Sequence, residues 1–312
     1  INFNTEIRKN ENRQLALNIT YRKLHIVNSI LSRQKADESL LGRADYTMRE
    51  FKGFITGNIL YELGAGQEQK REYTFFEVPA GQGEYTWIDY NSNGIKELNE
   101  FEIAIFQDQK KYVKLFTPGT QYVKANYVTF NYSIGLSPKN IIKPTAKGLM
   151  KLLYRSSSSS SLQINKKDLS TGKFAFNPFT KKLVDTTLIS LYSELTNTYF
   201  FNRSNIKWGF DVTHHLLNNK SLLSYGVESR KIRDFGGKIR WNPGRSINTT
   251  IALRNSKNEL FTSGTKFNNR NYQIALNRIE PAISFMHKST FRLTVNYSLY
   301  NKRNRIDSME KA

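Results

Sequence analysis

Cysteine is absent from the 312 residues, which excludes disulfides, thiolate catalysis and cysteine-bound zinc or iron–sulfur centres. Long apolar runs are absent as well, since no stretch approaches the ~18 consecutive apolar residues of a transmembrane helix. Crossing a membrane with strands stays open, because each such strand needs only ~9–11 alternating residues. The chain begins at Ile1 without a basic segment or an apolar run, so we interpret it as a mature segment or a fragment.

Acidic residues are scarce beside basic ones, with 26 Asp and Glu against 47 Lys and Arg and a formal net charge of +21. An excess of this size favours anionic partners, which include nucleic acid, lipid or lipopolysaccharide head groups and acidic glycans. Specific nucleic-acid recognition is not expected, because no helix-turn-helix, zinc-finger or RNA-recognition pattern accompanies the charge.

Alternation of apolar and polar residues is the dominant pattern of the chain. It is clearest at residues 291–299, where large apolar side chains occupy every second position and would share one face of an extended strand. The same pattern recurs at residues 15–21, 55–63, 128–136, 206–212, 223–227, 235–241, 247–253 and 272–276. These segments are rich in aromatic and β-branched residues, which favour strands.

Turn-forming clusters lie between these segments, at residues 217–220, 242–245 and 267–270. Short strands joined by such turns predict antiparallel hairpins. The expected fold is all-β, an antiparallel meander that forms either an outer-membrane β-barrel-like structure or an extended sheet. A sheet-on-sheet sandwich is the alternative.

Six consecutive serines at residues 156–161 mark a soft boundary between two regions. Residues 1–155 would form a β-rich region, and residues 162–312 a region of antiparallel hairpins. A serine run separates modules when it is a disordered linker. A polar strand face and an interstrand loop are the other interpretations.

The strongest local motif is the twelve-residue segment from Asp89 to Glu100. It follows the calcium-loop pattern Asp-x-Asn-x-Asn-Gly-x5-Glu without a gap. Calcium needs six to eight oxygen ligands, and Gly94 permits the sharp turn of such a loop. The expected ligands of one structural Ca²⁺ are the side chains of Asp89, Asn91, Asn93, Glu97 and Glu100 and the carbonyl oxygen of Ile95.

This loop differs from a helix–loop–helix EF-hand in two respects. Lys96 stands where an aliphatic residue is usual, and the residues before the loop, 85–88, favour a strand. Two Asn ligands in place of Asp lower the negative charge, which predicts weak calcium affinity. An ordinary Asn/Gly-rich turn is the alternative interpretation.

No catalytic motif is found. His214 and His215 are adjacent, and neighbouring residues of a regular strand point to opposite faces, so the pair is not expected to bind one metal. A serine nucleophile elbow of the form Gly-x-Ser-x-Gly is missing, and a Cys–His pair is excluded by composition. The protein is therefore not expected to be an enzyme.

Several segments carry a resemblance to a known group of proteins. They are residues 40–46, 61–68, 71–73 and 77–83, the calcium loop, and residues 199–205, 226–231 and 270–272. In these segments the chain resembles large, mostly uncharacterised cell-envelope proteins of the Bacteroidota. The resemblance implies an exported, β-rich protein of the outer membrane or cell surface, and it implies no activity.

Two functions are consistent with these patterns. The first is a structural or transport-related protein of the outer membrane, in which Leu293 and Val295 face lipid while Arg292 and Thr294 line the interior. Its partners would be outer-membrane lipid or lipopolysaccharide and other envelope proteins. The second is a soluble adhesion module of the cell surface, whose basic rim recognises anionic glycan or lipopolysaccharide.

Overall fold

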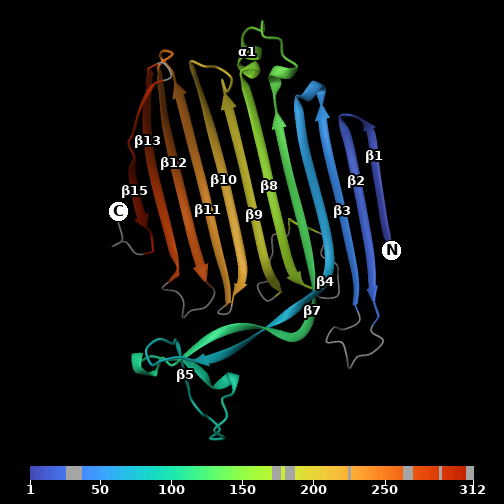
Figure 1. The fold of residues 1–312 in the computed structure, drawn as a ribbon, viewed down its shortest axis with the longest axis vertical. Coiled ribbons are helices and arrows are strands. Elements are labelled where there is room, and N and C mark those ends of the chain that lie inside the picture. The colour runs from blue at the N-terminus through green and yellow to red at the C-terminus, as the bar shows by residue number, and fades with distance from the viewer. Residues whose placement is uncertain are drawn as a thin grey trace.

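The computed structural model describes residues 1–25, 37–170, 177–179, 187–223, 226–262, 270–287 and 290–306. In this part of the chain most residues lie in strands of one antiparallel sheet. Most strands lie beside the strand that precedes or follows them in the sequence (Figure 1). The prediction of an all-β protein built from antiparallel hairpins is confirmed.

The sheet runs in the order β1-β2-β3-β4-β7-β8-β9-β10-β11-β12-β13-β14, with β15 also paired to β13. The strands are β1 (Asn2–Asn10), β2 (Arg13–Leu24), β3 (Asp37–Glu50), β4 (Ile55–Glu77), β5 (Tyr85–Trp87), β6 (Phe101–Ile103), β7 (Tyr112–Leu136), β8 (Ser156–Leu169), β9 (Leu188–Phe201), β10 (Trp208–Leu223), β11 (Gly226–Trp241), β12 (Ile247–Thr262), β13 (Tyr272–His287), β14 (Phe291–Asn296) and β15 (Leu299–Asn304). The helices are α1 (Leu149–Tyr154) and four 3-10 turns at Phe51–Gly53, Leu98–Glu100, Gln107–Gln109 and Pro138–Asn140.

The edges of the sheet are β1 on one side and β14 with β15 on the other. No pairing between these two edges is found among the described residues, so the sheet is open there.

None of the helices in the described part of the chain has the length and apolar character needed to cross a membrane.

Strand register separates the residues onto two faces, because residues paired across an antiparallel ladder point to the same side. Leu17, Tyr61 and Phe130 share one face through the pairs that join β2 to β7. We call it the apolar face. The opposite face carries Asp45 and Glu62 at neighbouring positions, and we call it the polar face.

The longest hairpin, β4 with β7, extends beyond the sheet and carries β5 and β6 at its end (Figure 1). We call this end, residues 75–112, the tip module. The Phe75 and Phe101 rings stack there with centroids 4.1 Å apart. Tyr85 meets Phe75 edge-on at 5.0 Å, and Tyr112 meets Phe101 at 5.1 Å. These four aromatic residues form a small core that holds the tip module to its stem.

The serine run is part of β8, where it pairs with β7 on one side and β9 on the other. The serine run is therefore part of a strand, and it is neither a linker nor an interstrand loop. The Ser160 hydroxyl donates to Asn197 Oδ1 at 2.6 Å. The sheet therefore continues through residues 156–161 without interruption.

Two local predictions are wrong. Residues 217–220 were expected to form a turn, but they lie inside β10 and pair with β9 and β11. The single strand expected at 223–227 is also wrong, because β10 ends at Leu223 and β11 begins at Gly226. Residues 224–225 lie outside the described residues. The turn predicted at 242–245 is confirmed, since β11 ends at Trp241 and β12 begins at Ile247.

The strand expected at residues 291–299 is divided into β14 and β15. The break lies opposite Pro281 in β13, whose carbonyl oxygen accepts from the Tyr297 amide at 3.0 Å. In an antiparallel ladder the N–H and C=O of one residue point to the same neighbour. Pro281 has no N–H to donate, so the ladder is interrupted at this point.

Candidate functional site

The apolar face exposes many large hydrophobic side chains. Trp241 in β11 is 56% exposed and Val295 in β14 is 60% exposed. The exposed members in β9 to β15 are Tyr199, Trp208, Phe235, Ile239, Trp241, Ile247, Ile251, Leu253, Phe261, Ile279, Ile283, Phe285, Phe291, Leu293, Val295 and Leu299. Soluble monomers rarely expose so large an apolar surface, which indicates that something other than water covers this face.

The best-covered part of this face lies over β7, β8 and β9. Ile164, Leu188 and Leu191 are buried there, with Phe130 and Leu162 packed against them. Phe179 approaches the Phe130 ring edge-on at 5.1 Å between centroids. This cluster is small, so the rest of the face has no second layer within the described part of the chain.

The apolar residues of this face, exposed in β10 to β15 and partly covered in β7 to β9, form a band with limits. In β12 the band runs from Ile247 to Leu253, about 20 Å at ~3.3 Å per residue, and in β7 it runs from Val128 to Leu136, about 26 Å. Charged residues follow at the end nearer the tip module. The cations are Lys23, Lys124, Lys166, Lys220, Lys231, Arg233, Lys257 and Arg303, and the acidic residues are Glu38, Asp168 and Glu259. The exposed Phe261 of β12 lies beyond Lys257 and is outside the band. Because the charged residues occupy the same face, they mark a border.

The band is also slanted relative to the strands. The row of paired residues through Tyr132, at the centre of the band in β7, reaches Ala275 in β13. The apolar residues of β13 instead centre on Pro281 and Ile283, about 23 Å further along the strand, while the two strands are about 29 Å apart. The strands are therefore tilted by about 40° from the perpendicular to the band.

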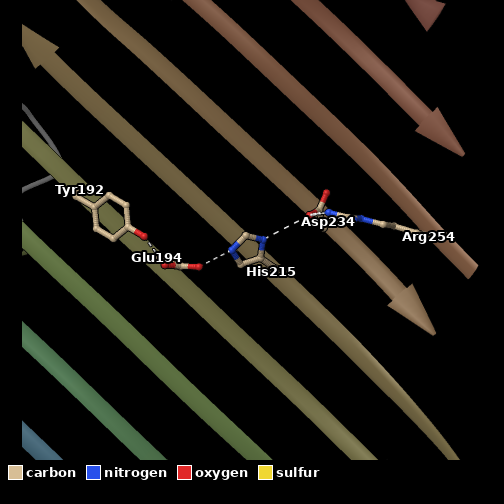
Figure 2. Close-up of polar contacts among 5 residues, drawn as sticks. All are labelled: Tyr192, Glu194, His215, Asp234 and Arg254. Carbon is tan, nitrogen blue, oxygen red and sulfur yellow. Dashed lines mark hydrogen bonds and ion pairs between the residues drawn. The ribbon is translucent and has the colours of Figure 1, made fainter. Parts of the chain in front are cut away.

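The polar face carries a network across β9, β10, β11 and β12 (Figure 2). His215 Nε2 lies 2.9 Å from Glu194 Oε1, and its Nδ1 lies 3.4 Å from Asp234 Oδ2. The Tyr192 hydroxyl donates to Glu194, and Arg254 donates to Asp234. His214 occupies the opposite face, as the alternation predicted.

This network links four strands through side chains, with Asp234 buried between His215 and Arg254. Both histidine nitrogens already have carboxylate partners, so neither is available as a metal ligand or as a base for a substrate. We interpret the network as a structural cross-link of the polar face. Sequence alone could place His215 on this face but could not identify its partners, which are 19 and 21 residues away.

A polar cleft of about 1110 Å³ lies at the end of the polar face beneath α1. Ser157 and Ser159 of the serine run line it, together with Lys151, Arg155 and Arg203. Arg155 is already engaged by the Asn202 side chain and by the Phe201 ring. The serines thus face a basic opening at the short-turn end of the sheet.

The predicted calcium loop forms the connection between β5 and β6. Asp89 Oδ1 and Oδ2 accept from the amides of Asn93 and Gly94 at 3.2 and 2.8 Å. Asn91 Oδ1 accepts from Asn93 N at 3.0 Å. Gly94 has a φ of +69°, a conformation that glycine adopts without strain. The first half of the loop is therefore curled around its own polar side chains.

The second half of the loop contains the other expected ligands. Asn93 Oδ1 accepts from Ile95 N at 2.7 Å, and the Asn91 amide donates to Glu97 Oε2 at 3.3 Å. Glu97 and Glu100 form a reciprocal capping box over the turn Leu98–Glu100. Across the described part of the chain, no three His, Asp or Glu side chains are grouped closely enough to hold a metal.

Glu100 is the exception in this exposed loop, because it is only 1% exposed. Its Oε2 accepts from Trp87 Nε1 at 2.9 Å and from Glu97 N at 3.3 Å. Its Oε1 is buried and has no hydrogen-bond partner. A buried carboxylate with an unpaired oxygen costs free energy unless a charge or a donor compensates it.

Lys96 points away from the loop towards its stem. Its Nζ lies 2.9 Å from Glu77 Oε2 in β4 and 5.0 Å from the centre of the Tyr112 ring. The hydrogen bond and the charge of Lys96 lower the pKa of Glu77. The unusual residue of the motif thus attaches the loop to the long hairpin.

Comparison of the chain with protein-family models, with curated proteins and with solved structures finds no significant match. The resemblance to envelope proteins of the Bacteroidota therefore stays a prediction.

Proposed function

We propose that the sheet is embedded in an outer membrane with its apolar face against lipid, and that the protein has a structural or transport-related role without enzymatic activity. The observation that carries the proposal is the apolar band, uncovered over β10 to β15, with a charged border at the end nearer the tip module. The tilt of the strands is within the ~35–45° of outer-membrane strands. The band is about 20–26 Å long along the strands, which at this tilt gives a height of about 15–20 Å, somewhat less than the ~25 Å apolar band of such proteins. A soluble sheet covered by a second layer would need neither an exposed apolar band nor this tilt of its strands.

Lipid imposes a condition on the edges of this sheet. Unpaired backbone N–H and C=O groups are costly in hydrocarbon, so no open edge faces lipid in a stable membrane sheet. The proposal therefore requires that β1 and the edge formed by β14 and β15 pair with each other or with another strand. Closure as a barrel is the arrangement that satisfies this condition with the observed tilt.

The charged border nearer the tip module contains cations that could bind lipid head groups. Arg233 and Lys257 are directly opposite each other in β11 and β12, and Lys231 lies two residues from Arg233 on the same face. Lys231 and Arg233 are exposed, while Glu259 approaches Arg233 only to 3.9 Å. We infer that these three cations contact the phosphates of outer-membrane lipid or lipopolysaccharide.

Single-cysteine labelling tests the orientation of the sheet, and the absence of native cysteine makes each label unique. Ile251→Cys and Ile283→Cys on the apolar face would be spin-labelled in proteoliposomes. The neighbours Ala252→Cys and Ala282→Cys on the polar face are the matched controls. We expect the first pair to be accessible to oxygen in lipid, and the second pair to water-soluble nickel complexes.

Equal accessibility of the two pairs would reject the membrane orientation. Full solubility of the protein without detergent would also reject it, and would favour the alternative of a soluble surface module that recognises anionic glycan.

Lipid phosphate binding has its own test. The triple variant Lys231→Gln, Arg233→Gln and Lys257→Gln should bind lipid A more weakly in detergent, as measured by native mass spectrometry. The control Arg230→Gln, Lys238→Gln and Arg292→Gln removes the same charge from the polar face. Binding should weaken with salt, so equal binding by both variants, or at low and near-molar salt, contradicts the assignment.

A further inference from the structure

The tip module contains a buried charge that the membrane function does not explain. Glu100 is enclosed while most of its loop is exposed, and the described part of the chain places no cationic side chain within ion-pair distance of it. Trp87 Nε1 and Glu97 N both donate to its Oε2. The carboxylate therefore lies between the end of β5 and the loop, with Oε1 available.

We propose that the segment from Asp89 to Glu100 binds one Ca²⁺, with Glu100 as the ligand on which binding depends most. This inference is independent of the membrane orientation. Two observations support it separately. One is the unbroken ligand spacing of the sequence, and the other is the buried, unpaired oxygen of Glu100. A divalent cation is the partner that compensates a buried carboxylate and accepts oxygen ligands from amides and carbonyls.

The remaining ligands come from the curled half of the loop. Asp89, Asn91 and Asn93 present side-chain oxygens that accept hydrogen bonds from loop amides. Carboxylate and amide oxygens have further lone pairs, so they can keep these bonds and also bind the ion. Glu97 and the Ile95 carbonyl complete the set. Ca²⁺ draws Glu100 and Asp89 together across the loop.

Binding has a consequence for the stem of the tip module. Trp87 connects Glu100 to β5, and Lys96 connects the loop to Glu77 in β4. The ion therefore fixes both ends of a loop that is already tied to β4 and β5. We expect calcium to order the tip module and to protect the Lys96–Glu97 bond from trypsin.

The loop has a modest negative charge, because two of its ligands are Asn. Comparable extracellular calcium modules bind with dissociation constants of ~10⁻⁴–10⁻³ M, and we expect the same range here. Terbium is a suitable probe, since Trp87 is close enough to the proposed site to sensitise its luminescence. The experiment is a Tb³⁺ titration of the purified full chain in detergent, followed by competition with Ca²⁺.

Three variants define the site. Glu100→Gln keeps the shape of the side chain and should weaken Tb³⁺ and Ca²⁺ binding at least tenfold. Glu84→Gln, an exposed glutamate of the same module, should bind like the original protein. Asn93→Asp adds a charged ligand and should bind severalfold more tightly, a gain that misfolding cannot imitate.

The proposal is overturned by any of three results. They are no saturable binding up to 10-fold above the expected range of ~10⁻⁴–10⁻³ M, unchanged affinity in Glu100→Gln, or unchanged affinity in Asn93→Asp. Trypsin cleavage after Lys96 that is equally fast in chelator and in saturating Ca²⁺ contradicts the ordering of the tip module by the ion. Absence of saturable binding would leave Asp89–Glu100 as an ordinary polar turn.

Discussion

The tip module and the main sheet place their large apolar side chains in opposite ways. In the tip module Phe75, Phe101, Tyr85 and Tyr112 face one another and make a small aromatic core. In the sheet, residues such as Trp241 face outward. Aromatic residues therefore pack against one another in the tip module and are left exposed in the sheet, a difference that the proposed membrane orientation would explain.

The polar residues follow the same division. The sheet gathers its charged groups into cross-strand networks such as that of His215, Glu194 and Asp234 on one face. The tip module disperses its polar groups over an exposed loop, and only Glu100 is buried there. Substitutions in the two regions should therefore affect the stability of different parts of the protein.

The largest expected effect comes from a charge placed within the band. Ile251→Arg should reduce the folding free energy in lipid by ~2–4 kcal/mol, the cost of Arg at the midplane of a membrane strand. Urea titration of the protein in lipid vesicles measures it. Ala252→Arg, the adjacent residue on the polar face, is the control and should cost much less. Equal losses from both changes would show that the faces do not meet different environments.

The second effect is confined to the tip module. Phe101→Ala removes the ring that stacks on Phe75 and should destabilise the module by ~2–4 kcal/mol, a little below the range for fully buried Phe. Hydrogen exchange should rise in β5 and β6 and stay unchanged in β9 to β13. Phe106→Ala changes an exposed ring in the same module and should have little effect. Increased exchange throughout the sheet would show that the two regions unfold together.

Calcium removal should have a smaller effect on the same module. A ligand that binds only the folded state stabilises by RT ln(1 + [L]/Kd), which is about 1.4 kcal/mol at tenfold excess. Chelation should thus increase hydrogen exchange in the tip module, and Glu100→Gln should remove this dependence. A melting transition of the tip module that is the same in chelator and in millimolar Ca²⁺ would contradict it.

The smallest effect concerns the exposed pair of Glu77 and Lys96. The hydrogen bond and charge of Lys96 lower the pKa of Glu77 below its ordinary 4.5, so this pair stabilises the tip module above that pH. The contribution is lost as the pH falls through the lowered value. Lys96→Gln should make exchange in the tip module less pH-dependent below pH 4.5, with chelator present throughout. A pH dependence identical to that of the original protein would exclude a role for the pair.

Much of the strand pattern was predictable, because alternation is a local property of the chain. Residues 128–136 and 247–253 alternate and lie in β7 and β12. Residues 217–220 misled the prediction, since their asparagines favour turns in isolation. In the sheet they are held by ladders on both sides, and tertiary pairing overrides local preference.

The candidate calcium loop shows how much of a site the sequence could predict. Its spacing is visible in the sequence, but the burial of Glu100 is not, because it depends on Trp87 and on the packing of β5 against β6 and β7. The division of the last expected strand is similar. Pro281 is visible in the sequence, but only register places it opposite Tyr297.

Spacing along single segments was enough to predict the antiparallel all-β character, the separation of apolar from polar residues and the order of the candidate ligands in the loop. The fold was needed to show that the apolar residues of neighbouring strands form one slanted band, that His215 bridges Glu194 and Asp234, and that the serine run is a strand. These features depend on register between strands, which fixes neighbours that are distant in sequence and which no single segment encodes.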